Sequence, residues 1–195
     1  MQRAMQRAMQ LDLALDAAAR MLPASESRAL IAAKTWEPLL LLWITAIRSN
    51  RALPCPGLVR QADEVSLGLR FTDDATIREL NSSWRQKPEA TDVLSFAALE
   101  DALDWMEGPC VELGDIVVSV ETACRQAHEQ NHSLGRELNW LVSHGLLHLL
   151  GWDHPDEASL RSMLSLQETL LSMVDQENPG NVQTQDETCG DRAGL

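Results

Sequence analysis

Three of the five histidines of this 195-residue chain lie within one short stretch, HGLLHLLGWDH. His144 and His148 are four residues apart, and His154 follows six residues later. On a helix, residues i and i+4 lie one above the other on the same face, so both imidazoles can reach one ion. Three protein ligands leave one position of a tetrahedral zinc ion open for water, as in catalytic zinc sites. The spacing therefore predicts a metal site, and nickel or another divalent ion would also accept three imidazoles.

The second residue of this stretch, Gly145, bears on which chemistry the metal would support. In zinc peptidases with the HExxH pattern, a glutamate at this position takes the proton from the water. Glycine cannot do so, although a bound metal lowers the pKa of water to about 7 without help from a side chain. A phosphodiester suits such a site, because its transition state gathers charge on non-bridging oxygens and needs cations more than a carboxylate base. The pattern favours cleavage of a phosphoester over cleavage of a peptide.

A helix, a helix end and a returning loop must position the three histidines. The apolar stretch Leu134–Leu150 predicts the helix, and Gly151 after it suits a left-handed helix end. Asp153, which precedes the third histidine, is a candidate acceptor for the hydrogen bond that holds a ligand imidazole. A solvated turn aspartate is equally consistent with the sequence at this position.

The remaining elements predict a single α+β domain over residues 9–174, with a small mixed sheet of about four strands covered by helices. The metal site would lie on a helix and loop of its C-terminal half. Strands are predicted from alternating apolar residues at Met9–Ala17, Glu64–Phe71, Asp92–Leu99 and Leu113–Val120. Further helices are predicted at Ser25–Asn50 with a break at Pro38, at Asp73–Trp84, at Ser119–Gln130 and at Pro155–Val174, with a loop at 54–57. Residues 1–8 would form an N-terminal extension and residues 175–195 a disordered acidic tail.

Composition narrows the function classes. The net charge of −13 argues against non-specific coating of nucleic acid, but six acids lie in the predicted loop Leu99–Asp115 and five in Val174–Leu195, so the rest of the surface can still present a basic face. Four widely spaced cysteines without a CxxC pair favour reduced thiols. The chain has no stretch of about 18 apolar residues and no secretion signal at its N-terminus, so we expect a cytoplasmic protein without membrane contact.

The histidine stretch resembles the signature of the YbeY family of bacterial endoribonucleases. Other stretches are similar to segments of the same family, in the same order: NSSWRQKPEATDVLSF (Asn81–Phe96), LGDIVVS (Leu113–Ser119) and RELNWLVSHG (Arg136–Gly145). The resemblance covers about Met9 to Val174.

The resemblance implies a zinc-dependent endoribonuclease, with one zinc ion per chain, that cleaves single-stranded RNA. It implies work on the 3′ end of small-subunit (16S) ribosomal RNA and in ribosome quality control. The partners would be this RNA and the ribosome or its assembly proteins, with no DNA.

By motif match, the resemblance makes His144, His148 and His154 the metal ligands. It makes Arg85 the cleft arginine that contacts phosphate, a role that suits a planar guanidinium able to pair with two oxygens at once. Asp92 and Asp115 recur in the family motifs, either near the metal or as anchors of strand ends and turns.

Some expectations and alternatives depend on residues around these motifs. Arg85 is predicted to lie in a loop, and Lys87 either assists it or, as the sequence favours, is a solvated lysine. His128 and His132 fall outside the metal spacing and are predicted to be surface residues. Two other functions stay open: a metal-dependent peptidase with the same histidine spacing, and a non-catalytic ribosome-assembly factor that zinc only stabilises.

Overall fold

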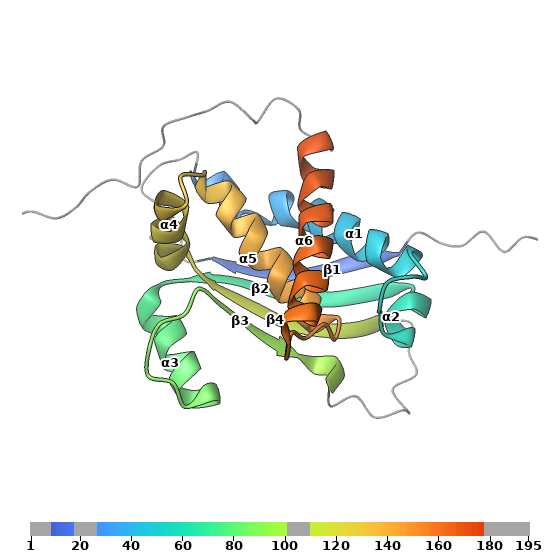
Figure 1. The fold of residues 1–195 in the computed structure, drawn as a ribbon, viewed down its shortest axis with the longest axis horizontal. Coiled ribbons are helices and arrows are strands. Elements are labelled where there is room, and N and C mark those ends of the chain that lie inside the picture. The colour runs from blue at the N-terminus through green and yellow to red at the C-terminus, as the bar shows by residue number, and fades with distance from the viewer. Residues whose placement is uncertain (1–8, 18–26, 101–109, 178–195) are drawn as a thin grey trace, which may run out of the picture.

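The structure, a computed structural model, describes residues 9–17, 27–100 and 110–177 (Figure 1). Four strands form one sheet in the order β1-β2-β4-β3. The strands β1 (Gln10–Ala17), β2 (Glu64–Thr72) and β4 (Cys110–Ser119) are parallel, and β3 (Val93–Ala97) pairs antiparallel with β4 at the edge. The predicted α+β domain with a small mixed sheet is therefore confirmed.

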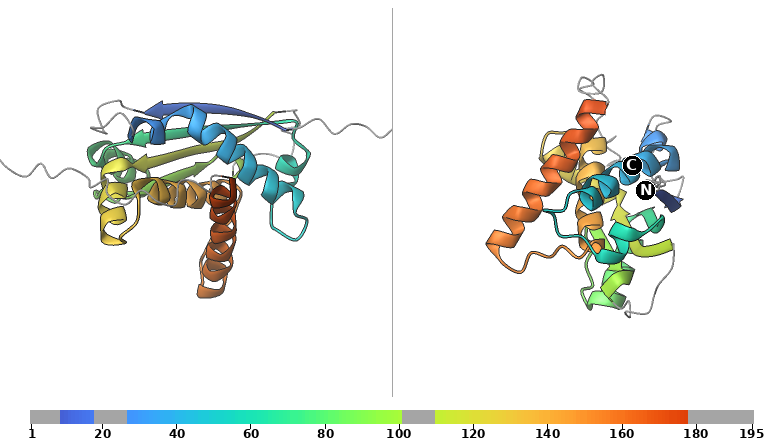
Figure 2. Two further views of the ribbon diagram at one scale, coloured as in Figure 1. Left: turned by 90° about the horizontal axis from the view of Figure 1, so that it is seen from above. Right: turned by 90° about the vertical axis from the view of Figure 1, so that its right-hand side faces the viewer.

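Helices cover one face of this sheet in two layers. The described helices are α1 (Ala33–Ser49), α2 (Gly57–Gln61), α3 (Asp74–Arg85), α4 (Val120–Glu129), α5 (Leu134–Leu149), α6 (Glu157–Glu177) and two short 3-10 helices, Ser27–Ile31 and Ala98–Glu100. Figure 2 shows α1 and α5 beneath the sheet, with α6 on the far side of α5 and pointing away from the strands. In the described part of the chain, no helix combines the length and apolarity needed to cross a membrane.

The alternating pattern of β2 explains how the sheet meets the helices. Its apolar residues are buried toward the helices, as the sequence predicted: Val65, Leu67, Leu69 and Phe71. Each such side chain contributes about 1.5–3 kcal/mol when it is fully buried. Helix α5 lies between the sheet and α6, so it buries apolar residues on both sides.

Helix α1 continues through Pro38, which the sequence suggested would break it. A proline inside a helix costs about 3 kcal/mol, because it removes a hydrogen bond and crowds the preceding turn. Burial of one face of α1 offsets this cost, since each large apolar side chain contributes about 1.5–3 kcal/mol. The buried residues of α1 are Trp36, Leu40, Trp43, Ile44 and Ile47.

Other boundaries also differ from the predictions. The short helix α2 begins at Gly57, at the end of the predicted loop 54–57, and buries Val59. Strand β4 begins at Cys110, three residues before the predicted start at Leu113, so the end of the predicted acidic loop is part of the sheet. Helix α6 continues to Glu177, three residues past the predicted domain end. Residues 1–8, 101–109 and 178–195, on which the predictions of an extension, an acidic loop and a tail fall, lie outside the described residues.

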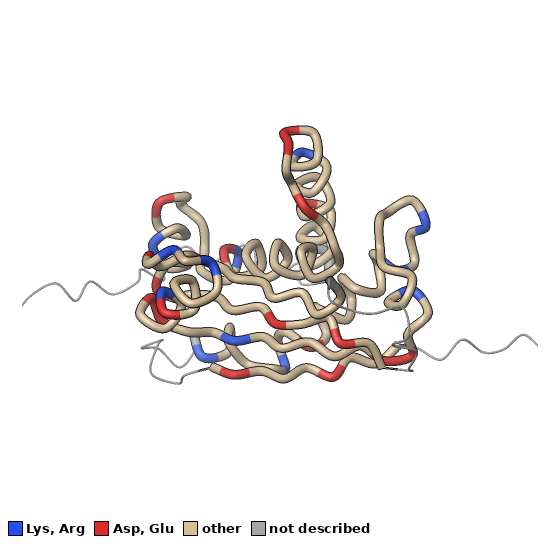
Figure 3. Tube along the Cα trace, turned by 90° about the horizontal axis from the view of Figure 1, so that it is seen from below, with Lys and Arg blue, Asp and Glu red and all other residues tan. Residues whose placement is uncertain are grey.

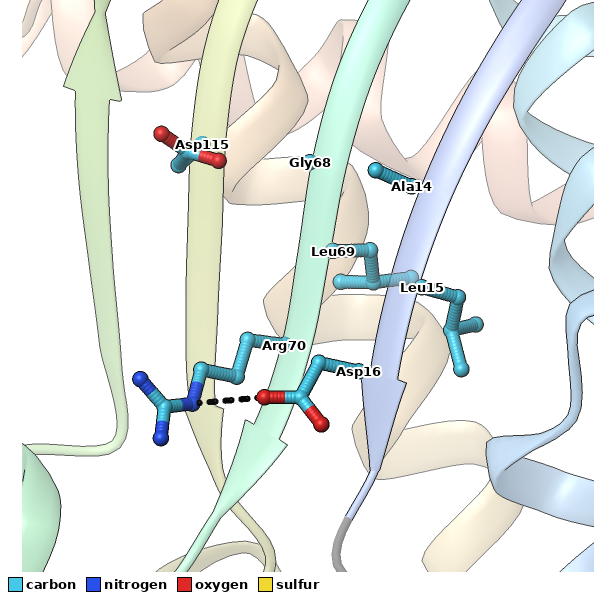
Figure 4. A pocket seen from close by; sticks show the side chains of 7 residues that line it. All are labelled: Ala14, Leu15, Asp16, Gly68, Leu69, Arg70 and Asp115. Carbon is cyan, nitrogen blue, oxygen red and sulfur yellow. Dashed lines mark ion pairs between the residues drawn. The ribbon is translucent and has the colours of Figure 1, made fainter.

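The opposite face of the sheet is only partly covered by described residues. Helix α3 packs over its β3–β4 end through Ile77, Leu94 and Val117. Charged residues lie along the strands (Figure 3), and on this face toward β1 Arg70 Nε lies 3.2 Å from Asp16 Oδ2 beside a shallow groove (Figure 4). The helix-covered face therefore holds the main core, and this one is largely polar.

Candidate metal centre

Helix α5 carries two partly exposed histidines, and the residues around them on the helix are buried. Between Leu141 and Leu149, every residue is buried except His144 and His148. The helix starts at the cap Ser133, whose hydroxyl accepts a hydrogen bond from the backbone N–H of Arg136 at 3.2 Å. One helical turn separates the two imidazoles, and their Nε2 atoms are 3.1 Å apart.

The end of α5 returns the chain so that a third imidazole reaches the same place. Gly151 has φ +82°, a left-handed conformation that glycine adopts without strain. The backbone N–H of Trp152 donates to the carbonyl of Leu147, and the indole N–H of Trp152 donates to the carbonyl of Pro54 at 3.1 Å. These bonds fix the returning loop, and the ring of His154 lies 5.3 Å from that of His148 between centroids. The predicted role of Gly151 at the helix end is thus confirmed.

The three imidazoles fit a divalent metal ion. One nitrogen from each of His144, His148 and His154 lies within 4.8 Å of the other two. Two nitrogens bound to one tetrahedral zinc at about 2.0–2.1 Å would be about 3.3 Å apart, close to the 3.1 Å between the two Nε2 atoms of α5. A set of three neutral imidazoles suits zinc and also nickel. The fold therefore brings the predicted ligands together as a group that can hold a metal.

A buried glutamine orients the first histidine, and the sequence analysis missed it. Gln167 of α6 is fully buried, and its Nε2 donates to the carbonyl of Trp140 at 2.7 Å. Its Oε1 therefore faces Nδ1 of His144 at 3.4 Å, which favours a proton on Nδ1 and leaves Nε2 free to bind a metal. The sequence did contain a signal for this residue, because Gln167 is a polar residue at a core-facing position of α6. Its buried neighbours there are Met163, Leu166 and Leu170.

Burial lowers the pKa of both histidines of α5. For His144, the neighbouring His148 and His154 lower the pKa further, while the hydrogen bond to Gln167 and the charge of Asp92 oppose the shift. For His148, the charge of His154 also lowers the pKa, a hydrogen bond to the Trp152 backbone and the charge of Asp153 raise it, and the charge of Arg85 lowers it. Lowered pKa values favour the neutral imidazoles that bind metals.

Arg85 lies near this group, although not in the predicted loop. It is the last residue of α3, and Gln86 caps the helix with φ 58°. The side chain is exposed, and its positive charge lowers the pKa of His148. Lys87 follows on the same exposed turn.

The three candidate aspartates lie in different places. Asp153 accepts a hydrogen bond from the backbone N–H of His154 at 2.8 Å and shapes the returning loop. Asp92 accepts from the backbone N–H of Val93 at 2.8 Å and from Gln126 at 3.0 Å, so it anchors the start of β3 to α4. Both still act on the histidines through their charge.

Asp115 points to the other face of the sheet. It leans over Gly68 in the groove of Figure 4, so that a Cβ added at Gly68 would meet its Oδ1 at 1.9 Å. The next residue, Ile116, faces α5 instead. The structure therefore does not bring Asp115 to the histidines, and only a shaping role for the sheet surface is visible.

The close approach of α5 to the sheet explains Gly145. A Cβ at this residue would lie 2.8 Å from Cγ2 of Ile116 and 3.1 Å from Oγ of Ser95. A longer side chain would be directed into the strands instead of toward the three histidines. The glutamate of HExxH peptidases has no room here, which argues against the peptidase alternative.

The two remaining histidines differ from each other. His128 is exposed on α4, as predicted. His132 is only partly exposed, and its Nε2 hydrogen-bonds Oε2 of the buried Glu137. The prediction of a surface residue therefore holds only in part for His132, because its ring contacts Glu137 in the first turn of α5.

Comparisons with known proteins show what the whole chain is similar to. A family model described as Endoribonuclease YbeY matches residues 50–175. A protein named Endoribonuclease YbeY from Synechococcus sp. (strain CC9902) is 62% identical over 86% of this chain and 91% of its own length. Proteins of the same name are 65% identical in Synechococcus sp. (strain CC9605), over 81% of this chain and 95% of the relative, and 57% identical in Prochlorococcus marinus (strain MIT 9313), over 81% and 84%.

A solved structure has the same fold. The solution structure of a protein from Thermotoga maritima matches 93% of this chain and all of its own length, with a TM-score of 0.54 at 21% identity. Because the family model and the close relatives each span most of the chain, the resemblance of the histidine stretch is confirmed. The chain belongs to the YbeY family of endoribonucleases.

Proposed function

We propose that this chain is a zinc-dependent endoribonuclease of single-stranded RNA in the cytoplasm, acting in 3′-end maturation of 16S ribosomal RNA and in ribosome quality control. The observation that carries the proposal is the meeting of three imidazoles at a partly exposed place, with an exposed arginine in electrostatic range. The names of the relatives support cleavage of RNA. Ribosomal RNA as the substrate, with the ribosome or its assembly proteins as partners, follows from the resemblance to the family.

The residues would have separate roles, which follow from their positions. His144, His148 and His154 would hold the metal, while Gln167 and the Trp152 backbone keep the two α5 rings oriented. When bound, a zinc ion would supply a Lewis acid and would lower the pKa of water. Arg85 would pair with oxygens of the phosphate and balance the charge that gathers there during cleavage.

The other two functions are less well supported. A peptidase would need a general base at Gly145, where the strands leave no space for one. A purely structural zinc would favour four protein ligands, whereas the described residues bring three histidines together here.

Cleavage assays with and without metal test the proposal. We expect zinc-loaded protein to cut a single-stranded oligoribonucleotide, to lose this activity with a chelator and to regain it with added zinc. A duplex of the same sequence and a mixed peptide pool are the matched controls, and both should stay intact. Peptide cleavage, or RNA cleavage that is unaffected by the chelator, would contradict the proposal.

Gln167 supplies a prediction that is independent of RNA. Gln167→Met keeps the volume of the buried side chain but removes the oxygen that faces His144. Loss of such an orienting partner typically weakens metal binding about 10- to 100-fold. Competition with a coloured zinc chelator measures this change.

Gln167→Glu is the comparison variant, because it keeps an acceptor oxygen that can face His144 and, like Gln167→Met, lacks the Nε2 donor to Trp140. It should bind zinc more tightly than Gln167→Met does. If folded Gln167→Met binds zinc with wild-type affinity, the orienting role is wrong.

A further inference from the structure

One large aromatic side chain, directly before Arg85 in the sequence, is left in solvent. Trp84, in the last turn of α3, is 71% exposed and is the most exposed large apolar residue of the described chain. Its ring meets that of Phe96 edge-on, with centroids 5.7 Å apart and planes at 66°. Phe96 thus braces one edge of the indole, while most of the ring stays open.

The turn that follows Trp84 is held in place by Asn81. This residue is 3% exposed, and its carbonyl accepts hydrogen bonds from the backbone N–H groups of Gln86 and Lys87. Its side-chain Nδ2 donates to the carbonyl of Glu89 at 2.9 Å. The exposed aromatic ring and the cations after it are therefore presented by an ordered turn.

The surroundings of Trp84 suit a nucleic acid better than a protein surface. Every residue from Ser82 to Glu89 is exposed, and apart from Trp84 and Pro88 these residues are polar or charged. This segment carries two cations, Arg85 and Lys87, and one acid, Glu89, so its net charge is positive. Protein interfaces place such aromatics at the centre of an apolar patch, whereas single-stranded RNA combines bases that stack on aromatic rings with phosphates that attract cations.

We propose that Trp84 is a stacking platform for an unpaired base of the RNA, next to the phosphate that Arg85 contacts. This inference rests on the proposed function and adds a reason for single-strand preference. A base within a duplex is stacked on its neighbours and paired, so it cannot lie flat on the indole. Stacking is tolerant of sequence because every base has a π-face, so Trp84 would not choose among bases.

The test compares Trp84→Ala and Trp84→Phe with wild type and with Ser83→Ala, the exposed neighbour. Affinity is measured by fluorescence anisotropy on zinc-loaded protein, with a 2′-O-methyl phosphorothioate single strand that resists cleavage. We expect Trp84→Ala to bind about 5- to 150-fold more weakly, while Trp84→Phe and Ser83→Ala stay near wild type. Removal of an uncharged ring should leave the salt dependence of binding unchanged.

Two further ligands separate stacking from other causes. On an abasic strand, wild type and Trp84→Ala should bind equally, because no base is present to stack. On a duplex of the same sequence the two should also agree. Zinc content and melting temperature should match wild type, since the ring is mostly exposed.

Failure of the inference and failure of the proposed function give different results. If wild type neither binds nor cleaves single-stranded RNA, the proposed function fails. If wild type cleaves RNA and Trp84→Ala binds the single strand equally well, only the stacking role fails. Loss of a co-purifying protein partner with unchanged RNA affinity would overturn stacking in favour of a protein contact.

Discussion

Replacing His148 by alanine is expected to abolish metal binding and RNA cleavage together. His148 is close to both other imidazoles of the group, with Nε2 3.1 Å from that of His144 and its ring 5.3 Å from that of His154. Two imidazoles that remain on separate elements are a poor site for zinc, which takes three protein ligands in open catalytic sites. Elemental analysis should find about one zinc per wild-type chain and close to none in the variant.

The control variant must remove an imidazole that has no part in this group. His128→Ala is suitable, because His128 is exposed on α4. His132 is less suitable, since its ring contacts the buried Glu137 and its loss would affect the start of α5. A folded His148→Ala protein with a full complement of zinc would refute the ligand assignment.

Arg85→Ala should keep the fold and the metal but lose most of the RNA cleavage. The side chain is exposed at the end of α3, so little packing is lost. Loss of one strong contact to the developing charge costs about 2–4 kcal/mol by analogy with lost oxyanion donors, or roughly 30- to 900-fold in rate. Single-turnover cleavage with saturating zinc measures the rate, and elemental analysis confirms the metal content.

Two further substitutions test whether Arg85 makes a specific contact with phosphate. Arg85→Lys should recover only part of the rate, because a point charge cannot contact two oxygens as a planar guanidinium does. Arg78→Ala removes the same charge from an exposed position two turns earlier on α3 and should have little effect. Equal losses in Arg78→Ala and Arg85→Ala would mean that general attraction of RNA, not a specific contact, is responsible.

Much of the metal centre could be predicted from local sequence. The pair His144 and His148 needs only the helical repeat to share a face, and Gly151 needs only its freedom at positive φ to end the helix. The alternation of β2 likewise predicts a strand with one buried face. These features depend on residues a few positions apart, so their geometry follows from the backbone repeat.

Features that join distant parts of the chain could not be obtained in this way. Gln167 reaches His144 from 23 residues away, because α6 packs on α5. Gly145 is required by Ile116 and Ser95, which two strands bring beneath it.

Asp115 also shows what local sequence alone cannot predict. It stands in a family motif, yet the pleat of β4 directs it to the face away from the histidines. Neighbouring residues of a strand point to opposite faces, and which face meets α5 depends on how sheet and helices pack. The local repeat determines which residues share a face, and tertiary packing determines what that face contacts.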